Sequence, residues 1–346
     1  MKAVFATAYG SPDVLEIRDV PKPVPKENEI LIRVRATTVT SGDWRIRTMN
    51  VPTGFGVMSR LALGVSGPRQ PILGTELAGE VESMGDAVTG FSAGDEVFAF
   101  SGAGGGCHAE YRTMPADGAV ALKPANLTFE EAAAISFGGT TALVFLRRAG
   151  IRRGDRVLVV GASGGVGTAA IQLARHFGAE VTGVCSTANV PMVRSLSADA
   201  IDYTQEDFSD RAERYDIIMD TTGTVGFGRA RASLKDSGRL LVVAGGLPDM
   251  LQIPWAALTT RMRIIAGPTS GNAEDLRFLA ALAEAGEYRP VIDRSYPLDR
   301  IADAHRYVDL GRKKGNVVIS VAGPVHGTGG EYVSDPSLSA ESTRDR

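Results

Sequence analysis

The stretch that most constrains the fold runs from Val157 to Gly167 and reads VLVVGASGGVG, four apolar residues followed by a turn with four glycines in seven positions. The short β-branched run predicts a strand buried on both faces of a parallel sheet. Apolar residues then recur at helical spacing up to Phe177, and Gly178 ends the run. This order of strand, glycine turn and helix suits a pyrophosphate, because the main chain can approach the anion and the helix N-terminus faces it.

The six residues ASGGVG within this stretch fit the dinucleotide-binding fingerprint, with Ala162 at the first glycine position and Gly164 and Gly167 at the second and third. A purely structural glycine turn is the alternative. On the first interpretation, the turn residues predicted to bind the cofactor are Ser163, Gly164, Gly165, Val166 and Gly167.

The composition narrows the kinds of partner. The chain has 346 residues, 37 of them basic and 40 acidic, with a net charge of −3, so it offers no basic surface for nucleic acid or an anionic membrane. No apolar run approaches the ~20 residues of a membrane span. Cys107 and Cys185 make no disulfide framework, and the N-terminal residues show no signal- or transit-peptide pattern. We therefore expect a cytoplasmic protein with a small-molecule partner.

The rhythm of predicted elements changes along the chain. Up to about Leu122 short strand-like runs are broken by Gly, Pro and Asn, which is typical of an irregular, barrel-like antiparallel domain. From about Thr128 predicted helices and strands alternate, which is typical of a doubly wound parallel sheet. Further helices are expected over 276–285 and 301–310, and the last strand, NVVISV, is expected to return to the first domain.

We therefore predict three parts. Residues 1–125, completed by 290–322, form the first domain, residues 126–289 form the dinucleotide-binding domain, and residues 323–346 form a disordered tail. Residues 44–73 lack a regular pattern, and long connections of this kind often line functional sites. We expect them to form one wall of a pocket between the domains, although their apolar side chains can also simply pack under the loop: Phe55, Met58, Leu61 and Leu63.

Several phrases, taken in order from Met1 to about Ala322, resemble the medium-chain dehydrogenase/reductase superfamily. They are ENEILIRV, GTELAGEVESMG, AGDEVFAF, HAEYRTMP, ASGGVGTAAIQLAR, YDIIMDTTG, and PLDRIADAHRYV with GNVVISV. The resemblance implies an α/β chain with an N-terminal GroES-like β-barrel domain, which carries the catalytic site, and a Rossmann domain. It also implies a homodimer, for which RMRIIAG is a plausible edge strand.

The zinc ligands of the alcohol dehydrogenases in this superfamily have no counterpart here. Those enzymes carry Gly-His-Glu where this chain has Gly74-Thr75-Glu76, a Cys where it reads VTSGDW, and often a four-cysteine lobe. A catalytic zinc needs about three protein ligands, whereas His108, His176, His305 and His326 are scattered in sequence. Cys107 and His108 adjoin in an apparent strand and are expected to point to opposite faces. We predict no metal site.

The closer resemblance is therefore to the zinc-free quinone oxidoreductase branch, which includes zeta-crystallin-like and chloroplast-envelope-type enone reductases. That branch usually carries VNxxD after its third strand, where this chain reads VTSGD. Asp43 matches, and Thr40 replaces the Asn. The Thr40 hydroxyl can hydrogen-bond near the nicotinamide, which makes Thr40 and Asp43 catalytic candidates. Equally, Thr40 or Ser41 can cap a short helix.

The end of the second strand of the dinucleotide fold favours NADP over NAD. NAD enzymes place there an acid that accepts the ribose hydroxyl and repels a 2′-phosphate. This chain has Cys185, and no acid follows until Asp199; the basic residue often found just beyond is replaced by Ala188. Three polar residues at this strand end either bind the phosphate or are ordinary turn residues: Ser186, Thr187 and Asn189.

The resemblance implies further contacts with the cofactor. Tyr203 is similar to a tyrosine near the adenosine, and Thr141 to a threonine beside the nicotinamide. Gly245, Gly246 and Gly267 follow predicted strands, whose carboxyl ends face ligands in sheets of this kind. Each can also be only a turn glycine.

A bound nicotinamide implies hydride transfer, and the lack of zinc ligands favours acceptors that spread the incoming charge by conjugation. We expect NADPH to reduce a quinone or an α,β-unsaturated carbonyl, with hydroxyl or main-chain donors on the carbonyl and a proton from solvent. Two other functions are kept open: an enoyl reductase acting on a carrier-bound acyl chain, and a non-catalytic NADPH-binding protein.

Overall fold

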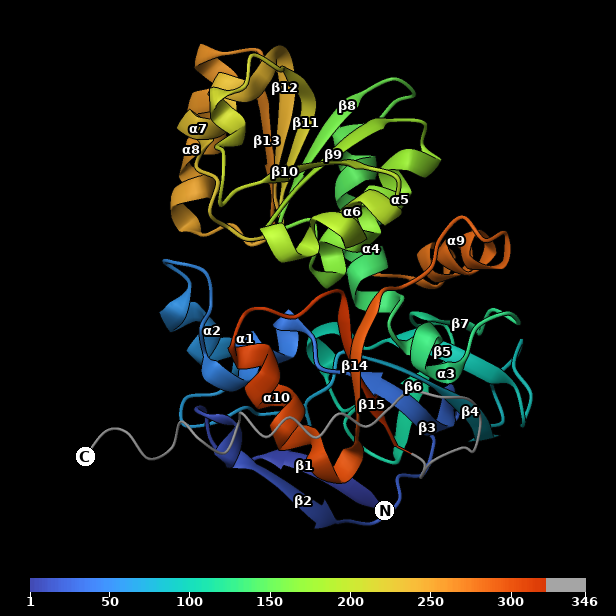
Figure 1. Cartoon of the computed structure of the whole chain (residues 1–346). Coiled ribbons are helices and arrows are strands. Elements are labelled where there is room, and N and C mark those ends of the chain that lie inside the picture. Colours follow the sequence, from blue (N-terminus) through green and yellow to red (C-terminus); the bar gives the residue numbers. More distant parts are fainter. Residues whose placement is uncertain (322–346) are drawn as a thin grey trace.

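The computed structural model describes residues 1–321, in which a parallel sheet stands above a second, mostly antiparallel sheet (Figure 1). The predicted tail, 323–346, lies outside these residues. The chain is an α/β protein with a Rossmann-type parallel sheet, as predicted. Among residues 1–321 no helix combines the length and apolar character that crossing a bilayer would require.

The upper sheet has six parallel strands in the order β10-β9-β8-β11-β12-β13. Alternate residues along β8 face two different cores: Val157 and Val159 pack into one, Leu158 and Val160 into the other. The run VLVV is therefore buried on both faces, as predicted. The strands are β8 (Arg156–Val160), β9 (Glu180–Cys185), β10 (Asp199–Asp202), β11 (Tyr215–Asp220), β12 (Leu234–Val242) and β13 (Arg263–Ala266).

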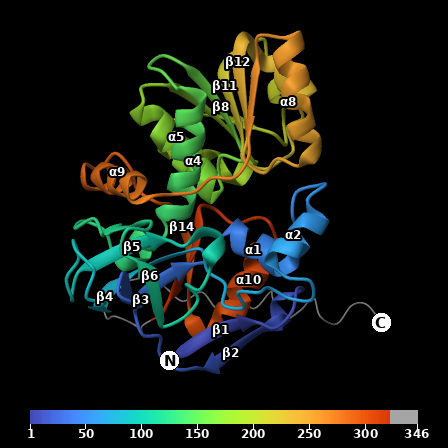
Figure 2. The same cartoon turned by 180° about the vertical axis from the view of Figure 1, so that it is seen from behind.

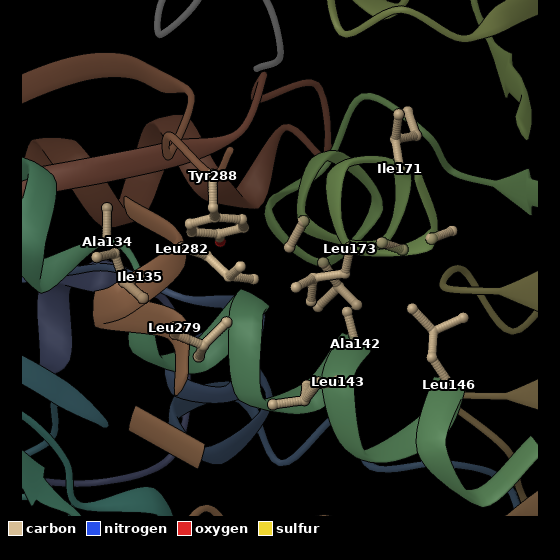
Figure 3. Packing of buried hydrophobic residues seen from close by; sticks show 14 of the residues in the cluster. Ala134, Ile135, Ala142, Leu143, Leu146, Ile171, Leu173, Leu279, Leu282 and Tyr288 are labelled. Atoms are coloured by element: carbon tan, nitrogen blue, oxygen red, sulfur yellow. The ribbon is translucent and has the colours of Figure 1, made fainter. Parts of the chain in front are cut away.

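Helices cover both faces of this sheet. Figure 3 shows one packed layer, in which Leu143, Leu173 and Leu279 from three different helices lie together with Tyr288. The helices of this part are α4 (Ser136–Ala149), α5 (Gly165–His176), α6 (Val190–Ser195), α7 (Phe227–Ser233), α8 (Leu247–Thr259) and α9 (Ala273–Glu284).

The lower sheet has the order β14-β15-β3-β4-β5-β7, with β6 also paired to β3, and β1 and β2 form a separate pair. The last strand, β15, pairs antiparallel with β3, so the predicted return of the chain to its first part is confirmed. The strands are β1 (Lys2–Ala6), β2 (Leu15–Asp19), β3 (Glu29–Thr38), β4 (Glu76–Met84), β5 (Glu96–Phe100), β6 (Tyr111–Pro115), β7 (Val120–Leu122), β14 (Ile292–Pro297) and β15 (Asn316–Ser320).

The stretch 44–73, which lacks a regular pattern in sequence, contains two short helices, α1 (Ser41–Thr48) and α2 (Gly56–Leu63). Met58 and Leu61 on α2 are more than half exposed, so the idea that they pack under the loop is wrong. Helix α8 was also missed, because two prolines interrupt its sequence. The remaining helices are α3 (Phe129–Ala133) and α10 (Ile301–Asp309).

The carboxyl ends of the parallel strands face the lower sheet. After β12, the backbone N–H of Leu247 donates to the carbonyl of Thr53, and after β8, Gly315 donates to the carbonyl of Ser163, at 2.8 and 2.7 Å. Figure 2 shows α4 running from the parallel sheet toward the lower one. The strand ends at which sheets of this kind bind ligands therefore meet the part of the chain that carries Thr40 and Asp43.

Candidate functional site

The glycine turn after β8 has the geometry of a pyrophosphate cradle. A Cβ at Gly167 would lie 2.1 Å from the carbonyl oxygen of Gly161, so only glycine lets α5 pack this closely on the strand. At Gly164, by contrast, the only atom near an added Cβ is the same carbonyl oxygen, at 3.6 Å, which leaves room for a ligand. Together with the N-terminus of α5, these features fit a dinucleotide.

The turn also lies at the topological switch point of the sheet. The strand order places β9 on one side of β8 and β11 on the other, and ligands of such sheets bind where the order reverses. Gly138 on α4 packs against the turn, since a Cβ there would lie 2.7 Å from the Gly165 carbonyl oxygen. Thr141, one helical turn further on, is buried.

Residues near the end of the chain lie along this turn and were not anticipated from the sequence. Besides the Gly315 bond to Ser163, a Cβ at Gly165 would lie 2.8 Å from Asn316 Oδ1. Asn316 begins β15, whose pairing with β3 places it here. The sequence predicts that the last strand returns to the first part of the chain. It does not give the pairing register that places Gly315 and Asn316 beside the glycine turn.

Three of the predicted cofactor residues meet at the end of β9. Asn189 Nδ2 donates to Ser163 Oγ and to Ser186 Oγ, both at 3.1 Å. The side chain of Asn189 is buried, and its Oδ1 has no hydrogen-bond partner among the described residues. The glycine turn and the β9 turn are thus joined by one amide that keeps a free acceptor.

Thr187 and Tyr203 lie at the neighbouring strand ends. The Thr187 and Thr204 hydroxyl oxygens are 2.9 Å apart, and Tyr203, whose backbone N–H donates to the Cys185 carbonyl, exposes 61% of its surface. An exposed ring beside β9 is available to stack on an adenine. Sequence reasoning did not consider Asp202, which pairs in register with Cys185.

The three strand-end glycines differ in their surroundings. Gly246 caps α8 and packs on the lower part of the chain, because a Cβ there would lie 2.7 Å from the Thr53 carbonyl oxygen. Gly245, just before it, is crowded only by Val242 of its own strand. Gly267 has a φ of +113° and open space around it. All three lie beyond the carboxyl ends of β12 and β13.

Thr40 and Asp43 form the capping box of α1. The Asp43 backbone N–H donates to Thr40 Oγ1, while Asp43 Oδ2 accepts from the Thr40 backbone N–H and hydroxyl at 2.8 and 2.6 Å. Asp43 Oδ1 accepts from the Gly74 backbone N–H at 3.0 Å. The predicted capping role of Thr40 is therefore confirmed, and a catalytic role stays a prediction.

A small pocket of about 30 Å³ opens beside this box. Asp43 and Thr75 supply polar atoms to it, and the Thr75 hydroxyl lies 3.1 Å from Thr40 Oγ1. Apolar side chains from α1, α2 and the segment before β4 complete most of the wall: Ile46, Leu63, Ile72 and Leu73. Leu63 is the one member of the predicted apolar wall that lines it. The pocket has apolar walls and polar atoms at one end, and its volume admits only a small group.

Glu76 lies directly behind the pocket and is fully buried. It accepts hydrogen bonds from the Thr38 hydroxyl and from the Phe137 backbone N–H. Burial raises the pKa of Glu76 to about 8 despite these bonds, and the nearby charge of Asp43 adds to the rise. A carboxyl group that is neutral near pH 7 therefore sits between the lower sheet and the start of α4.

The histidines are less scattered than the sequence indicates. The rings of His108 and His305 stack edge to face with centroids 5.7 Å apart. His108 Nε2 lies 2.9 Å from the Thr38 carbonyl oxygen, and Arg47 Nε donates to His305 Nδ1 at 3.2 Å. Burial lowers the pKa of His305. Folding brings these residues together because α10 packs on α1, which no local pattern reveals.

Cys107 and His108 precede β6 in a loop, so the predicted strand is wrong; both side chains are buried. His176 pairs with Glu287 on the surface, and His326 lies outside the described residues. In residues 1–321 no three His, Cys, Asp or Glu side chains are grouped as a metal would require. Thr75, at the position of the zinc-binding histidine, does not fit a zinc site.

Comparisons with known proteins agree with this geometry. The sequence matches the family models of the alcohol dehydrogenase GroES-like domain, over residues 26–124, and of zinc-binding dehydrogenases, over residues 196–319. The chain is 35% identical over 332 residues to the 2-methylene-furan-3-one reductase of Solanum lycopersicum, covering 92% of this chain and 79% of that protein.

Two further similarities concern quinone oxidoreductases. The human enzyme is 32% identical over 327 residues, which cover 90% of this chain and 94% of the human one. The solved structure of the quinone oxidoreductase from Coxiella burnetii superposes with a TM-score of 0.82 at 29% identity, covering 93% of this chain and 99% of that one.

Proposed function

Because the chain belongs to the quinone oxidoreductase branch of the medium-chain dehydrogenase/reductase superfamily, we propose that it is a zinc-independent, NADPH-dependent reductase of quinones or α,β-unsaturated carbonyls. The family makes it an NAD(P)-dependent oxidoreductase with a small-molecule substrate. The proposal adds the acceptor, which is taken from the activities named for its relatives, and the preferred cofactor. The observation that supports it is the glycine cradle, which Gly138 and Phe137 of α4 connect to Gly42 beside Asp43.

The residues around the cradle would hold the cofactor. The turn from Ser163 to Gly167 would take the pyrophosphate, Ser186, Thr187 and Asn189 the adenosine ribose with its 2′-phosphate, and Tyr203 the adenine. Thr141, with Gly245, Gly246 and Gly267 at the strand ends, would border the nicotinamide half. When bound, NADPH supplies a hydride. The lack of an acid at Cys185 supports NADPH over NADH.

The chain's own residues would bind and orient the acceptor. The pocket beside Thr75 would give the substrate carbonyl a hydroxyl whose hydrogen turns from Thr40 Oγ1 to the carbonyl oxygen, while the apolar side chains of Ile46 and Leu63 would contact the conjugated carbons. Asp43 fixes the backbone of Gly74 and, through Thr40, the hydroxyl of Thr75. Conjugation in the substrate delocalises the added charge, so a modest donor set suffices.

A panel of electrophiles tests the proposal. Purified protein should oxidise NADPH in the presence of a quinone or a short enone, followed by loss of NADPH absorbance, and should barely oxidise simple alcohols with NADP. Turnover of thioester enoyl substrates far above that of free enones would indicate a carrier-linked enoyl reductase instead. Saturable NADPH binding without turnover of any electrophile would indicate a binding protein.

We also propose a homodimer. In residues 1–321, β13 pairs only with β12, so its other edge faces outward, and an open strand edge is a ready site for pairing with a second copy. Light scattering at working concentration should give twice the mass of the 36.4 kDa chain. A monomer under these conditions would end the idea.

A further inference from the structure

Strand register places an acidic side chain where the sequence of β9 has none. In the parallel pair of β10 and β9, Asp202 lies opposite Cys185, the position at which NAD enzymes carry an acid on the second strand. Asp202 is the last residue of β10, so it too stands at the carboxyl end of the sheet. The neighbouring strand β10 therefore supplies a carboxylate, that of Asp202, at the end of the sheet where β9 has Cys185.

The carboxylate of Asp202 is tied to the turn that follows β9. Its Oδ1 accepts from the Thr204 backbone N–H at 3.0 Å and from the Thr204 hydroxyl at 2.8 Å, and that hydroxyl lies 2.9 Å from Thr187 Oγ1. Hydrogen bonding from Thr187 and then Thr204 lowers the pKa of Asp202. The group is therefore an anion at neutral pH, held beside a residue proposed to meet the 2′-phosphate.

Within the part of the chain that the structure describes, Asp202 forms no ion pair. The nearby Arg211 is engaged with Glu206, and Arg194, whose charge acts on Cys185, makes no ion pair with Asp202. Position 188, where related reductases often have a basic residue, is Ala188. A phosphate dianion at this turn would therefore meet a carboxylate that no ion pair holds.

The free acceptor on Asn189 also favours a ribose hydroxyl over a phosphate. Among residues 1–321 no donor reaches the buried Asn189 Oδ1, while the amide nitrogen of the same side chain donates to Ser163 and Ser186. A ribose hydroxyl can donate to such an oxygen, whereas a phosphate dianion offers only acceptors. Two independent features of this turn thus suit a hydroxyl better than a phosphate.

We propose that Asp202 is a specificity-determining residue of the cofactor site, whose carboxylate weakens the binding of a 2′-phosphate and accepts a ribose hydroxyl, so that NADH is used beside NADPH. The inference rests on the proposed function, since it concerns the same nucleotide site. It assigns to β10 a role that the fingerprint assigns to the end of β9.

Nucleotide titrations of the full-length protein test it without relying on turnover. Asp202→Asn keeps an acceptor for Thr204 but removes the charge, so the ratio of the NADH to the NADPH dissociation constant should rise roughly five- to tenfold. Asp202→Glu, which keeps the charge, should change the ratio little. Asp199→Asn, at the other end of the same strand, is the matched control and should leave it unchanged. The effect of Asp202→Asn should shrink at high salt.

The outcomes separate the two proposals. An unchanged ratio in a folded Asp202→Asn variant, or an equal change in the Asp199→Asn control, overturns the role of Asp202. If Asp202→Asn does not fold, the ratio of the NADH to the NADPH dissociation constant is measured at low and high salt in the unmodified protein and in Asp202→Glu. A ratio that does not change with salt in either protein also overturns the role of Asp202. Failure of the unmodified protein to bind either nucleotide would instead contradict the proposed function.

Discussion

Glu76 accepts a hydrogen bond from the backbone N–H of Phe137, so a carboxyl group of the lower sheet is fixed to the first turn of α4. Its other oxygen accepts from Thr38, at the end of β3. The same turn of α4 carries Gly138, which packs on the glycine cradle. Glu76 thus links the pocket side of the molecule to the helix that borders the cofactor site.

This link predicts a pH-dependent stability. The pKa of Glu76 is about 8 in the folded chain, against an ordinary value of 4.5, so between these values the folded state keeps a proton that the unfolded state releases. Stability from this group is therefore full below about pH 4.5 and falls as pH rises toward 8. Glu76→Gln cannot lose a proton, so its stability lacks this decline. The free energy of unfolding of the variant minus that of the unmodified protein should therefore increase by up to about 3 kcal/mol from pH 5 to pH 8.

Urea unfolding of both proteins at the two pH values measures this difference. Glu96→Gln is the control, because Glu96 lies in the same sheet with a half-exposed side chain. It should not change the pH dependence. A constant difference between Glu76→Gln and the unmodified protein across this range would contradict the buried neutral carboxyl.

Thr40 offers a second test, through the cap of α1. Thr40→Ala removes the acceptor for the Asp43 backbone N–H and should lower the free energy of unfolding by about 1 kcal/mol. Thr40→Ser keeps the hydroxyl and should restore it. The melting curves of the three proteins compare these effects.

The same variants examine the predicted catalytic role. The hydroxyl oxygens of Thr40 and Thr75 lie 3.1 Å apart, so we expect Thr40 to position the Thr75 hydroxyl. In assays well below the melting temperature of the variant, turnover should fall several-fold in Thr40→Ala and recover in Thr40→Ser. Thr40→Gly keeps most of the capping stability without a hydroxyl, so it should be nearly as stable as the unmodified protein yet slow. Equal turnover in Thr40→Gly and the unmodified protein would leave Thr40 with the cap alone.

Local patterns predicted much of this fold, and long-range pairing explains what they missed. The glycine turn and the α1 cap depend on neighbours within a few residues, so VLVVGASGGVG and VTSGD were sufficient. Helix α8 has Pro248 in its first turn and Pro254 in its interior. In sequence these prolines favour a loop, although Pro is well tolerated in a first turn. The contacts of His108 with His305 and of Asp202 with Cys185 need sheet register and helix docking, which a sequence alone does not specify.

Zinc content gives the third prediction. Thr75 stands at the position of a zinc-binding histidine, and its hydroxyl is engaged with Thr40, so dialysed protein should contain far less than one zinc per chain by elemental analysis. A chelator should leave both NADPH oxidation and the melting temperature unchanged, because no folding energy depends on a metal. Retention of about one zinc per chain would show that the ligand set has been misidentified.

The last prediction changes the cofactor site in both directions. Cys185→Asp places a carboxylate at the end of β9, where it accepts the ribose hydroxyl and repels a 2′-phosphate, and should shift the kcat/KM ratio toward NADH by about tenfold or more. Ala188→Arg adds a cation beside Thr187 and should shift the ratio toward NADPH by a similar factor, since a guanidinium pairs well with phosphate.

Arg at 188 also neutralises Asp202, so combining Ala188→Arg with Asp202→Asn should give less than the product of the two single effects. Steady-state rates with both nucleotides and one quinone measure all four proteins, with Ala188→Gln as the uncharged control. A strong NADH preference in the unmodified chain would contradict the proposed preference for NADPH. Shifts with the opposite sign would show that the 2′ site lies elsewhere.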